Sequence, residues 1–379
     1  LVVNSSDASS GTCPIVVTRT YVVTDACGNS TTRTQIINVN DSTSPGITGS
    51  IATTTIEGCA ANAVAAPVTT VSALEGLGLS ISDACTSDAN LVVTSSDAST
   101  GTCPIVVIRT YVVTDACGNS TTRTQIINVN DTTAPSITGT IATTTVEGCT
   151  AGNATAAVAT VAALEGLGLT ITDACTSDAN ISVTSSDAST GTCPIVVTRT
   201  YVVTDACGNS TTKTQIINVN DTTAPAVTGA ITNTIVEGCT IGDAPVAVTT
   251  VAALEALTGN LQISDACTSD ASLVVSSTQT STGTCPLVIT RIYKVTDACG
   301  NTSADITHTI QVNDTTVPAV TGSITAITVE GCSVSDAPAA VTTVAALEAL
   351  TGTLQIADAC TADATLTVTS SQTASGTCP

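Results

Sequence analysis

Cysteine is the residue type in this chain with the most regular pattern for chemistry. The 379 residues include 17 cysteines and one histidine, and the cysteines recur in four motifs, EGC, DACT, GTCP and DACGN. The motifs supply, in that order, Cys59, Cys149, Cys239 and Cys332; Cys85, Cys175, Cys267 and Cys360; Cys13, Cys103, Cys193, Cys285 and Cys378; and Cys27, Cys117, Cys207 and Cys299. Even neighbouring cysteines, such as Cys13 and Cys27, stand much farther apart than the paired C-x-x-C knuckles of zinc sites. The pattern indicates disulfide bonds formed in an oxidising compartment.

The pairing can be predicted from the place of each motif in a seven-stranded sandwich. The DACT and DACGN motifs follow the expected strands B and F, which run the same way, so their cysteines meet at one end of a repeat. The EGC and GTCP cysteines meet at the opposite end. Two bridges inside each repeat would close loops of 30–45 residues and contribute roughly 3–4 kcal/mol each. The predicted pairs are Cys59–Cys103, Cys85–Cys117, Cys149–Cys193, Cys175–Cys207, Cys239–Cys285, Cys267–Cys299 and Cys332–Cys378.

Acidic residues form a second chemical pattern, at the boundaries between repeats. Each boundary carries an Asn-Asp pair such as Asn130–Asp131, and loops of the following repeat carry Asp173, Asp205 and Asn209. Glu57, at the end of an expected strand, can reach the same place. Hard oxygen ligands that converge on a flexible joint suit Ca²⁺. Asn and Asp are equally ordinary turn residues, so a calcium site and simple turns both remain open here.

These residues are placed by a tandem repeat with a period of 90 to 93 residues. The stretch VNDTTAP, or a close variant of it, ends each unit, because Asn and Asp favour turns and Pro cannot continue a central strand. The sequence begins and ends within a repeat, which leads us to expect further repeats on both sides. The predicted domains are a C-terminal half-repeat at 1–45, complete repeats at 46–135, 136–225 and 226–318, and the N-terminal part of another repeat at 319–379.

Within a unit, the hydrophobic period is mostly two, which predicts strands. In residues 14–26, Ile15, Val17, Tyr21 and Val23 share one face. The exception is a segment rich in Ala, Leu and Glu, which predicts one or two turns of helix. The expected strands are 14–26, 32–40, 47–58, 79–83 and 91–97 and their counterparts, and the expected helix is 69–78. About seven short strands in 90 residues are typical of an immunoglobulin-like sandwich, so the predicted fold is an all-β tandem array of such repeats, each with a short helical insert and two disulfides.

Two side chains in this strand pattern have expected roles. Arg109 and its counterparts fall in register with the buried face, and we expect each to pair with the EGC glutamate of its own repeat. Tyr111 and its counterparts are expected to anchor the core.

Composition excludes several classes of function. Eight basic residues against thirty acidic ones, with a net charge of −22, disfavour nucleic acid and anionic membrane surfaces as partners. No apolar run approaches the ~18–20 residues of a membrane span. One unrepeated histidine allows no repeated Ser-His-Asp set, and no repeated carboxylate pair looks desolvated. We therefore expect a protein that is not an enzyme.

The segment RTYVVTDACGNSTTRTQIINVNDTTAP, residues 109–135, resembles the hyalin-type immunoglobulin-like repeat. It is most similar to the version in giant surface proteins of Bacteroidetes, including gliding-motility adhesins exported by the type IX route. The carrying motifs are the tyrosine strand, DACGN, the Gln-Ile-Ile strand and the DTTAP linker, and they recur along the whole chain. The resemblance implies an elongated extracellular molecule concerned with adhesion at a bacterial surface.

The function predicted from these patterns is a non-enzymatic surface fibre or adhesin stalk. Its expected partners are neighbouring repeats or copies of the same chain, with a surface or glycan ligand bound outside these residues. One alternative is a multivalent array of carbohydrate- or protein-binding modules, although the repeats present no exposed aromatic platform. Another is a set of accessory repeats of a secreted enzyme.

Overall fold

The computed structural model describes residues 1–376 and divides into two compact units, each described by itself. The first comprises residues 1–144, 155–188 and 198–217, and the second contains the other described residues. The chain is all-β, with tandem immunoglobulin-like repeats of about 90 residues. The predicted fold class is therefore confirmed.

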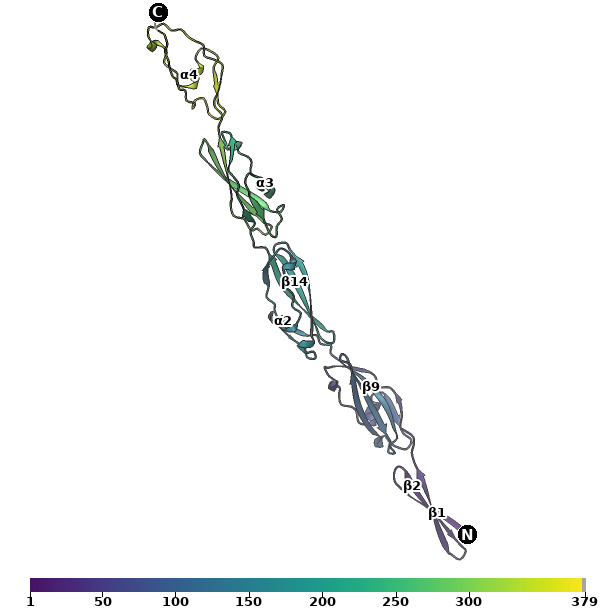
Figure 1. Ribbon diagram of the computed structural model, residues 1–379. Helices are drawn as coiled ribbons and strands as arrows, with labels where there is room; N and C mark the ends of the chain where they lie inside the picture. Colours follow the sequence, from purple (N-terminus) through teal and green to yellow (C-terminus); the bar gives the residue numbers. More distant parts are fainter. Residues whose placement is uncertain (377–379) are drawn as a thin grey trace. The chain divides into compact units, whose positions relative to one another are not determined.

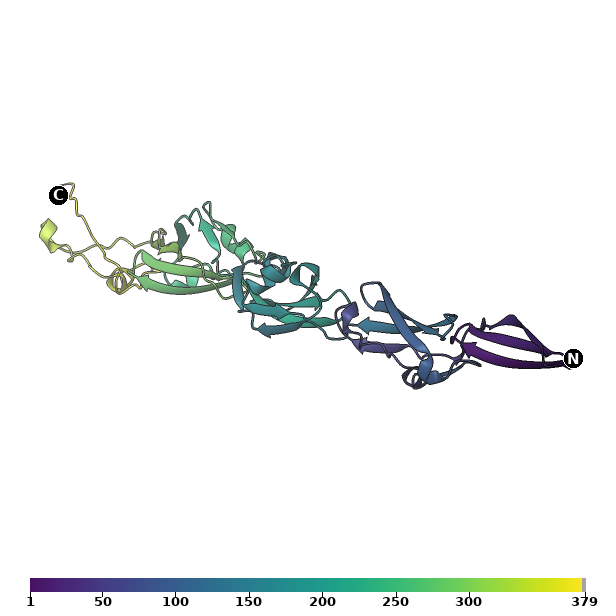
Figure 2. The same ribbon diagram turned by 90° about the horizontal axis from the view of Figure 1, so that it is seen from below.

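The first 45 residues form one antiparallel sheet of three strands, β1 (Val2–Ser10), β2 (Ile15–Thr24) and β3 (Ser30–Val39), in the order β1-β2-β3. The three strands lie side by side near the N-terminus (Figure 1 and Figure 2). They match the predicted strands at 14–26 and 32–40 closely, because the alternation of apolar and polar residues fixes which face each side chain occupies.

The predicted repeat 46–135 contains two sheets. Strands β4 and β6 pair antiparallel, and the other sheet has the order β5-β9-β8-β7, in which β5 runs parallel to β9. Its elements are β4 (Gly46–Gly49), β5 (Thr54–Glu57), α1 (Val71–Glu75), β6 (Leu79–Ser82), β7 (Val92–Thr100), β8 (Ile105–Thr114) and β9 (Ser120–Asn130), with 3₁₀ turns at Ala61–Ala63 and Asp88–Asn90. Six strands stand where the sequence suggested about seven.

The predicted strand 47–58 is divided between the two sheets. Strand β4 ends at Gly49, which has φ +87°, a conformation that glycine adopts without a Cβ penalty. A Cβ at Gly49 would stand 2.4 Å from the carbonyl oxygen of Gly78. The chain therefore leaves one sheet and enters the other at a position that only glycine fits.

The short helix α1 closes the core of this repeat. Thr70 caps its N-terminus by accepting a hydrogen bond from the Ala73 N–H at 3.3 Å, and Val71 and Leu74 are buried. They pack in one cluster with Tyr111 from β8 and with residues of β4, β6 and β7. The helical segment and the core tyrosine thus agree with the sequence, and a thin core without Phe or Trp is completed by a helix.

The remaining repeats follow the same plan. The repeat 136–225 contains β10 (Ser136–Gly139), β11 (Thr144–Glu147), α2 (Val161–Glu165), β12 (Leu169–Thr172), β13 (Ser182–Thr190), β14 (Ile195–Thr204) and β15 (Ser210–Asn220). The repeat 226–318 contains β16 (Ala226–Thr228), β17 (Thr234–Glu237), α3 (Val251–Glu255), β18 (Gln262–Ser264), β19 (Val274–Thr282), β20 (Leu287–Thr296) and β21 (Ile306–Asn313). The last segment contains β22 (Ala319–Thr321), α4 (Val344–Glu348) and β23 (Gln355–Ala357). Further 3₁₀ turns lie at Ala151–Asn153, Asp178–Asn180, Ile241–Asp243 and Val334–Asp336.

Candidate functional site: the junctions between repeats

Disulfide bonds join each repeat to the next one. Every bridge joins two successive repeats. It pairs an EGC cysteine with the DACT cysteine of the following repeat, or a GTCP cysteine with the DACGN cysteine of the following repeat. The six bridges are Cys13–Cys117, Cys59–Cys175, Cys103–Cys207, Cys149–Cys267, Cys193–Cys299 and Cys239–Cys360. Their Cα–Cα distances, 4.7 to 5.3 Å, lie in the ordinary range for disulfides. Each junction between two complete repeats therefore carries two bridges.

The predicted pairs inside a repeat are not formed, and this corrects the sequence prediction. The pairs absent from the described structure are Cys59–Cys103, Cys85–Cys117, Cys149–Cys193, Cys175–Cys207, Cys239–Cys285 and Cys267–Cys299. Cys332–Cys378 involves a residue outside the described range.

Sheet order gives the physical reason for this correction. Cys59 follows β5 and Cys103 precedes β8, so the two do lie at the same end of their repeat, but β9 runs between those strands. Two strand spacings separate them by about 10 Å, which is beyond the reach of a disulfide. The cysteines that come within reach belong to the neighbouring repeat.

Three carboxylates gather at the junction between repeats 46–135 and 136–225. One oxygen each from Asp131, Asp173 and Asp205 lies within 4.8 Å of the others. The Asp173 carboxylate accepts hydrogen bonds from the backbone N–H of Cys175 and of Thr176, at 2.9 and 2.6 Å. The structure thus brings together the three aspartates that the sequence placed on the linker and on two loops of the next repeat.

Asparagine and disulfide contacts fix two of these aspartates. Asn209 donates through Nδ2 to the Asp131 backbone oxygen at 3.0 Å and to the Asp205 carboxylate at 2.8 Å. Asp205 also accepts from the N–H of Cys207 at 2.8 Å, and Cys207 is bonded to Cys103. The disulfide and the carboxylate cluster are consequently parts of one structure.

Asp131 has an incompletely satisfied carboxylate. Its side chain is 3% exposed, and Oδ2 has no hydrogen-bond partner in the described structure, while its other oxygen accepts from the Thr133 N–H at 3.0 Å. Burial, and then the charges of Asp173, Asp205 and Glu57, raise the pKa of Asp131 above its usual range. A buried carboxylate with an unpartnered oxygen and other negative charges nearby is stabilised by a bound proton or by a neighbouring cation.

Glu57 and Asn130 lie at the same junction without joining the carboxylate cluster. The Glu57 carboxylate accepts from the N–H of Thr132 at 3.1 Å and from hydroxyls of Thr132 and Thr133 at 2.6 and 3.3 Å. These bonds lower the pKa of Glu57. The Asn130 Oδ1 lies 3.3 Å from the Cys103 sulfur. Of the six predicted metal ligands, three carboxylates converge, and Glu57, Asn130 and Asn209 position the linker.

The neighbouring junctions repeat this arrangement. Asp41, Asp83 and Asp115 form the corresponding cluster, and Asn119 donates to the Asp41 backbone oxygen at 3.1 Å. In the second unit, Asp221 is 3% exposed and its Oδ2 again has no described partner. Asp221 and Asp297 lie close together there, beside Cys299. The Cys299 sulfur forms the disulfide with Cys193. The feature is thus a property of the junction and is reproduced with the period of the sequence.

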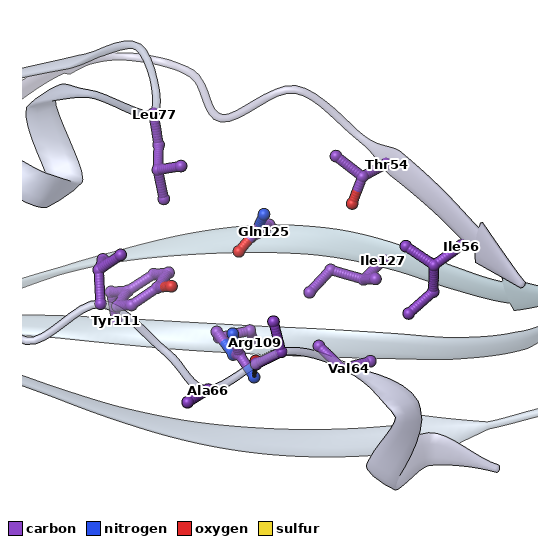
Figure 3. A pocket seen from close by; sticks show the side chains of 11 residues that line it. Thr54, Ile56, Val64, Ala66, Leu77, Arg109, Tyr111, Gln125 and Ile127 are labelled. Atoms are coloured by element: carbon purple, nitrogen blue, oxygen red, sulfur yellow. Dashed lines mark hydrogen bonds between the residues drawn. The ribbon is translucent and has the colours of Figure 1, made fainter. Parts of the chain in front are cut away.

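A cavity inside repeat 46–135 could also accept a ligand. It has a volume of about 200 Å³ and lies between strands β5, β8 and β9 and the segment 64–68. Figure 3 shows Arg109, Tyr111 and Gln125 among its lining side chains.

The charge in this cavity is already paired. The Arg109 guanidinium binds Asp97 at 2.8 Å through both Nε and Nη2, and it also donates to the Ala65 carbonyl at 2.9 Å. The predicted partner Glu57 is wrong. The signal for the correct partner was the constant spacing from Asp to Arg in each of the first three repeats, since the two residues face each other across the β7–β8 hairpin and its counterparts.

In the described part of the chain, no helix combines the length and apolarity required to cross a bilayer.

Comparisons with known proteins place few constraints on this chain. No protein-family model matches it, and no curated protein matches it. Among solved structures, it is similar to the protocadherin gammaB4 extracellular domain, with 10% identity and a TM-score of 0.26 over 84% of this chain and 61% of that one. Drosophila N-cadherin EC1-4 gives 12% identity and a TM-score of 0.25 over 80% and 85%, and the human desmocollin-1 ectodomain gives 11% and 0.22 over 82% and 70%. Likenesses this weak carry no argument, so the resemblance to hyalin-type repeats stays a prediction.

Proposed function

We propose that the protein is a non-enzymatic, extracellular repeat protein that serves as a tension-resistant adhesin stalk. The observation that carries this proposal is the pair of disulfides across each junction between complete repeats. Disulfides persist in oxidising surroundings outside the cytosol, and bridges placed between repeats constrain the connection between domains rather than the interior of one.

The bridges define a covalent path shorter than the polypeptide. Starting at Cys13, the path crosses to Cys117 and returns along β8 to Cys103. From Cys103 it crosses to Cys207, and the next repeat continues it along β14. Each repeat contributes only the segment between its GTCP and DACGN cysteines, such as residues 103–117, which spans about 50 Å when fully extended. An unbridged repeat of about 90 residues could extend to about 300 Å.

Force spectroscopy tests the proposal directly. When the oxidised chain is pulled from its two ends, the complete repeats should give no extension steps of about 300 Å, because the bridges bypass their interiors. After reduction, those steps should appear. Steps of that full length in the oxidised chain would contradict the stalk function.

A partial variant provides the matched control. Cys103→Ser combined with Cys193→Ser removes the path along the strands but leaves the EGC–DACT bridges. Within the repeat 136–225, those bridges leave residues 149–175 as the connecting path. The variant should therefore extend by at most about 90 Å per repeat.

We also propose that the junction carboxylates bind Ca²⁺. Three aspartate oxygens within 4.8 Å and a buried, unpartnered Asp131 oxygen support this, because Ca²⁺ takes oxygen ligands and neutralises converging carboxylates. Calcium should raise the melting temperature relative to a chelator. In the Asp131→Asn variant, calcium should raise the melting temperature by less. The Asp178→Asn variant, whose change lies on an exposed turn outside the cluster, should retain the full increase. An unchanged melting temperature with calcium in the unmodified chain would remove the metal proposal and leave the stalk proposal intact.

The resemblance to surface repeats of gliding bacteria supports placement at a bacterial surface. Immunogold electron microscopy with an antibody against one repeat tests this. Label on filaments that project from cells is the expected result. Label confined to soluble material or substrate would favour the accessory or binding-module alternatives.

A further inference from the structure

The cavity in repeat 46–135 contains a buried polar group that lacks a hydrogen-bond partner. Gln125 on β9 is 8% exposed, and its side-chain amide forms no hydrogen bond within the described part of the chain. Figure 3 shows this amide among the side chains that line the cavity. A buried amide without a partner carries the cost of its lost hydration. The Gln125 amide is therefore stabilised by any molecule in the cavity that can form hydrogen bonds with it.

The following repeat satisfies the same two side chains internally. In 136–225, the Tyr201 hydroxyl donates to the Gln215 amide oxygen at 3.3 Å. In 46–135, the corresponding Tyr111 and Gln125 form no such bond in the described structure, and both face the cavity. The open polar group is thus a feature of this repeat and not of the repeat pattern.

Pro67 distinguishes the segment that covers the cavity. In 136–225, Val158 follows Ala157, and its N–H donates to the core tyrosine hydroxyl at 3.5 Å. In 46–135, Val68 follows Pro67, and the described structure has no bond from the Val68 N–H to Tyr111. Proline fixes its own φ and restricts the residue before it. Segment 64–68 therefore has less freedom to close onto the tyrosine.

The lining favours an uncharged ligand with an apolar body. The apolar lining residues are Ile56, Val64, Val68, Leu77 and Ile127. Arg109 is the charged residue of the lining, and its ion pair with Asp97 already neutralises it. A charged ligand would therefore be buried without a counter-ion, which is costly. A single hydroxyl is a better match for Gln125, because an amide can both accept from a hydroxyl and donate to it.

The size of the cavity and its opening set the size of the ligand. An engineered protein cavity of about 150 Å³ holds benzene, so the volume of about 200 Å³ found here suits one six-membered ring with small substituents. Thr54 lines the cavity and is exposed. A ligand of this size can therefore enter from solvent beside Thr54.

We propose that this cavity binds a small, uncharged ring compound that carries one hydroxyl group. The ring lies against the apolar walls, and the hydroxyl forms hydrogen bonds with the Gln125 amide. This inference goes beyond the stalk function and does not depend on it.

A pair of fluorinated probes tests the proposal on the full chain. Para-fluorophenol has the hydroxyl, para-fluorotoluene has a methyl group in its place, and fluorine NMR measures the binding of each. Para-fluorophenol should bind saturably, with one site per chain. In Gln125→Leu, its affinity should fall about three- to tenfold, whereas the affinity for para-fluorotoluene should not fall. The variant should keep its fold, because replacing an unbonded amide with an apolar side chain of similar size leaves no unsatisfied group.

Two further variants locate the site. Ala66→Leu adds volume to a residue of the lining and should weaken the binding of both probes. Gln215→Leu, at the equivalent position of repeat 136–225, is the matched control and should leave both affinities unchanged.

Three results would overturn the proposal. The first is the absence of saturable para-fluorophenol binding, which would mean that the cavity holds water only. The second is an unchanged para-fluorophenol affinity in Gln125→Leu, or an equal loss of affinity for the two probes. The third is a loss of binding in Gln215→Leu as large as that in Gln125→Leu.

Discussion

The repeats 46–135 and 226–318 both bury an arginine on the inner face of the four-stranded sheet, but the neighbours of that arginine differ. Arg109 and Arg291 are each 4% exposed. Arg109 forms an ion pair with Asp97, whereas the corresponding contact of Arg291 is the Gln279 amide oxygen, at 3.1 and 2.8 Å. Across the sheet, Arg109 lies opposite Gln125, and Arg291 lies opposite His308.

The two substitutions leave the third complete repeat with an unbalanced buried charge. His308 is 2% exposed; its Nε2 lies 2.8 Å from the Thr234 hydroxyl, and its Nδ1 has no described partner. Burial and the charge of Arg291 lower the pKa of His308. Arg291 lies directly opposite His308 in the sheet and supplies this charge. The comparison teaches that repeats with the same fold can differ in their response to pH.

The largest expected effect should be equal in the two repeats. Tyr111→Ala and Tyr293→Ala remove fully buried core side chains and should each lower the local free energy of unfolding by about 3–5 kcal/mol. Hydrogen exchange followed by mass spectrometry reads each repeat separately, because the two repeats give different peptides. If one substitution lowered the free energy of unfolding by several kcal/mol more than the other, the two repeats would not have equivalent cores.

Acid should distinguish the repeats. His308 has a folded pKa below its unfolded value of about 6.5, so the stability it contributes is present above that pH and is lost as the pH falls below it. Asp97 has a lowered pKa because of Arg109, and its contribution is lost only as the pH falls below about 3.8. Between pH 6.5 and 4.5, the protection against hydrogen exchange, corrected for the intrinsic pH dependence of amide exchange, should therefore fall more in 226–318 than in 46–135.

Reciprocal variants sharpen this difference. His308→Gln should remove the acid response of its repeat, and Gln125→His should introduce one into 46–135. If His308→Gln leaves the response unchanged, another group titrates in that repeat.

The smallest effect concerns the ion pair itself. Gln279→Asp should stabilise repeat 226–318 by about 0.5–1 kcal/mol, and Asp97→Gln should destabilise 46–135 by a similar amount. The value is modest because the Asp97 side chain is 40% exposed. Both changes in stability should disappear in double variants that also carry Arg291→Met or Arg109→Met in the same repeat. The same hydrogen-exchange measurement checks them. Additive effects in such double variants would contradict a direct contact.

Much of the local structure could be predicted from the sequence. Period-two alternation specifies the strands because one face of each sheet is buried, and the run of Ala, Leu and Glu specifies the helix that Thr70 caps. The same pattern identified Tyr111 as a core residue. Topology also places Cys59 and Cys103 at one end of a repeat, and it places Asp131 near Asp173 and Asp205 of the next.

The partners of these residues were decided by the tertiary structure. A motif that recurs in every repeat looks the same whether its cysteine bonds within a repeat or across a junction, so the sequence alone does not separate the two. Sheet order separates them, because β9 stands between β5 and β8 and keeps Cys59 from Cys103, while Cys175 of the next repeat comes within bonding distance. In the same way, the hairpin register, and not the presence of a nearby glutamate, gives Arg109 its partner Asp97. The sequence by itself determines the repeating unit and the residues at its ends, and packing between units determines which of those residues meet.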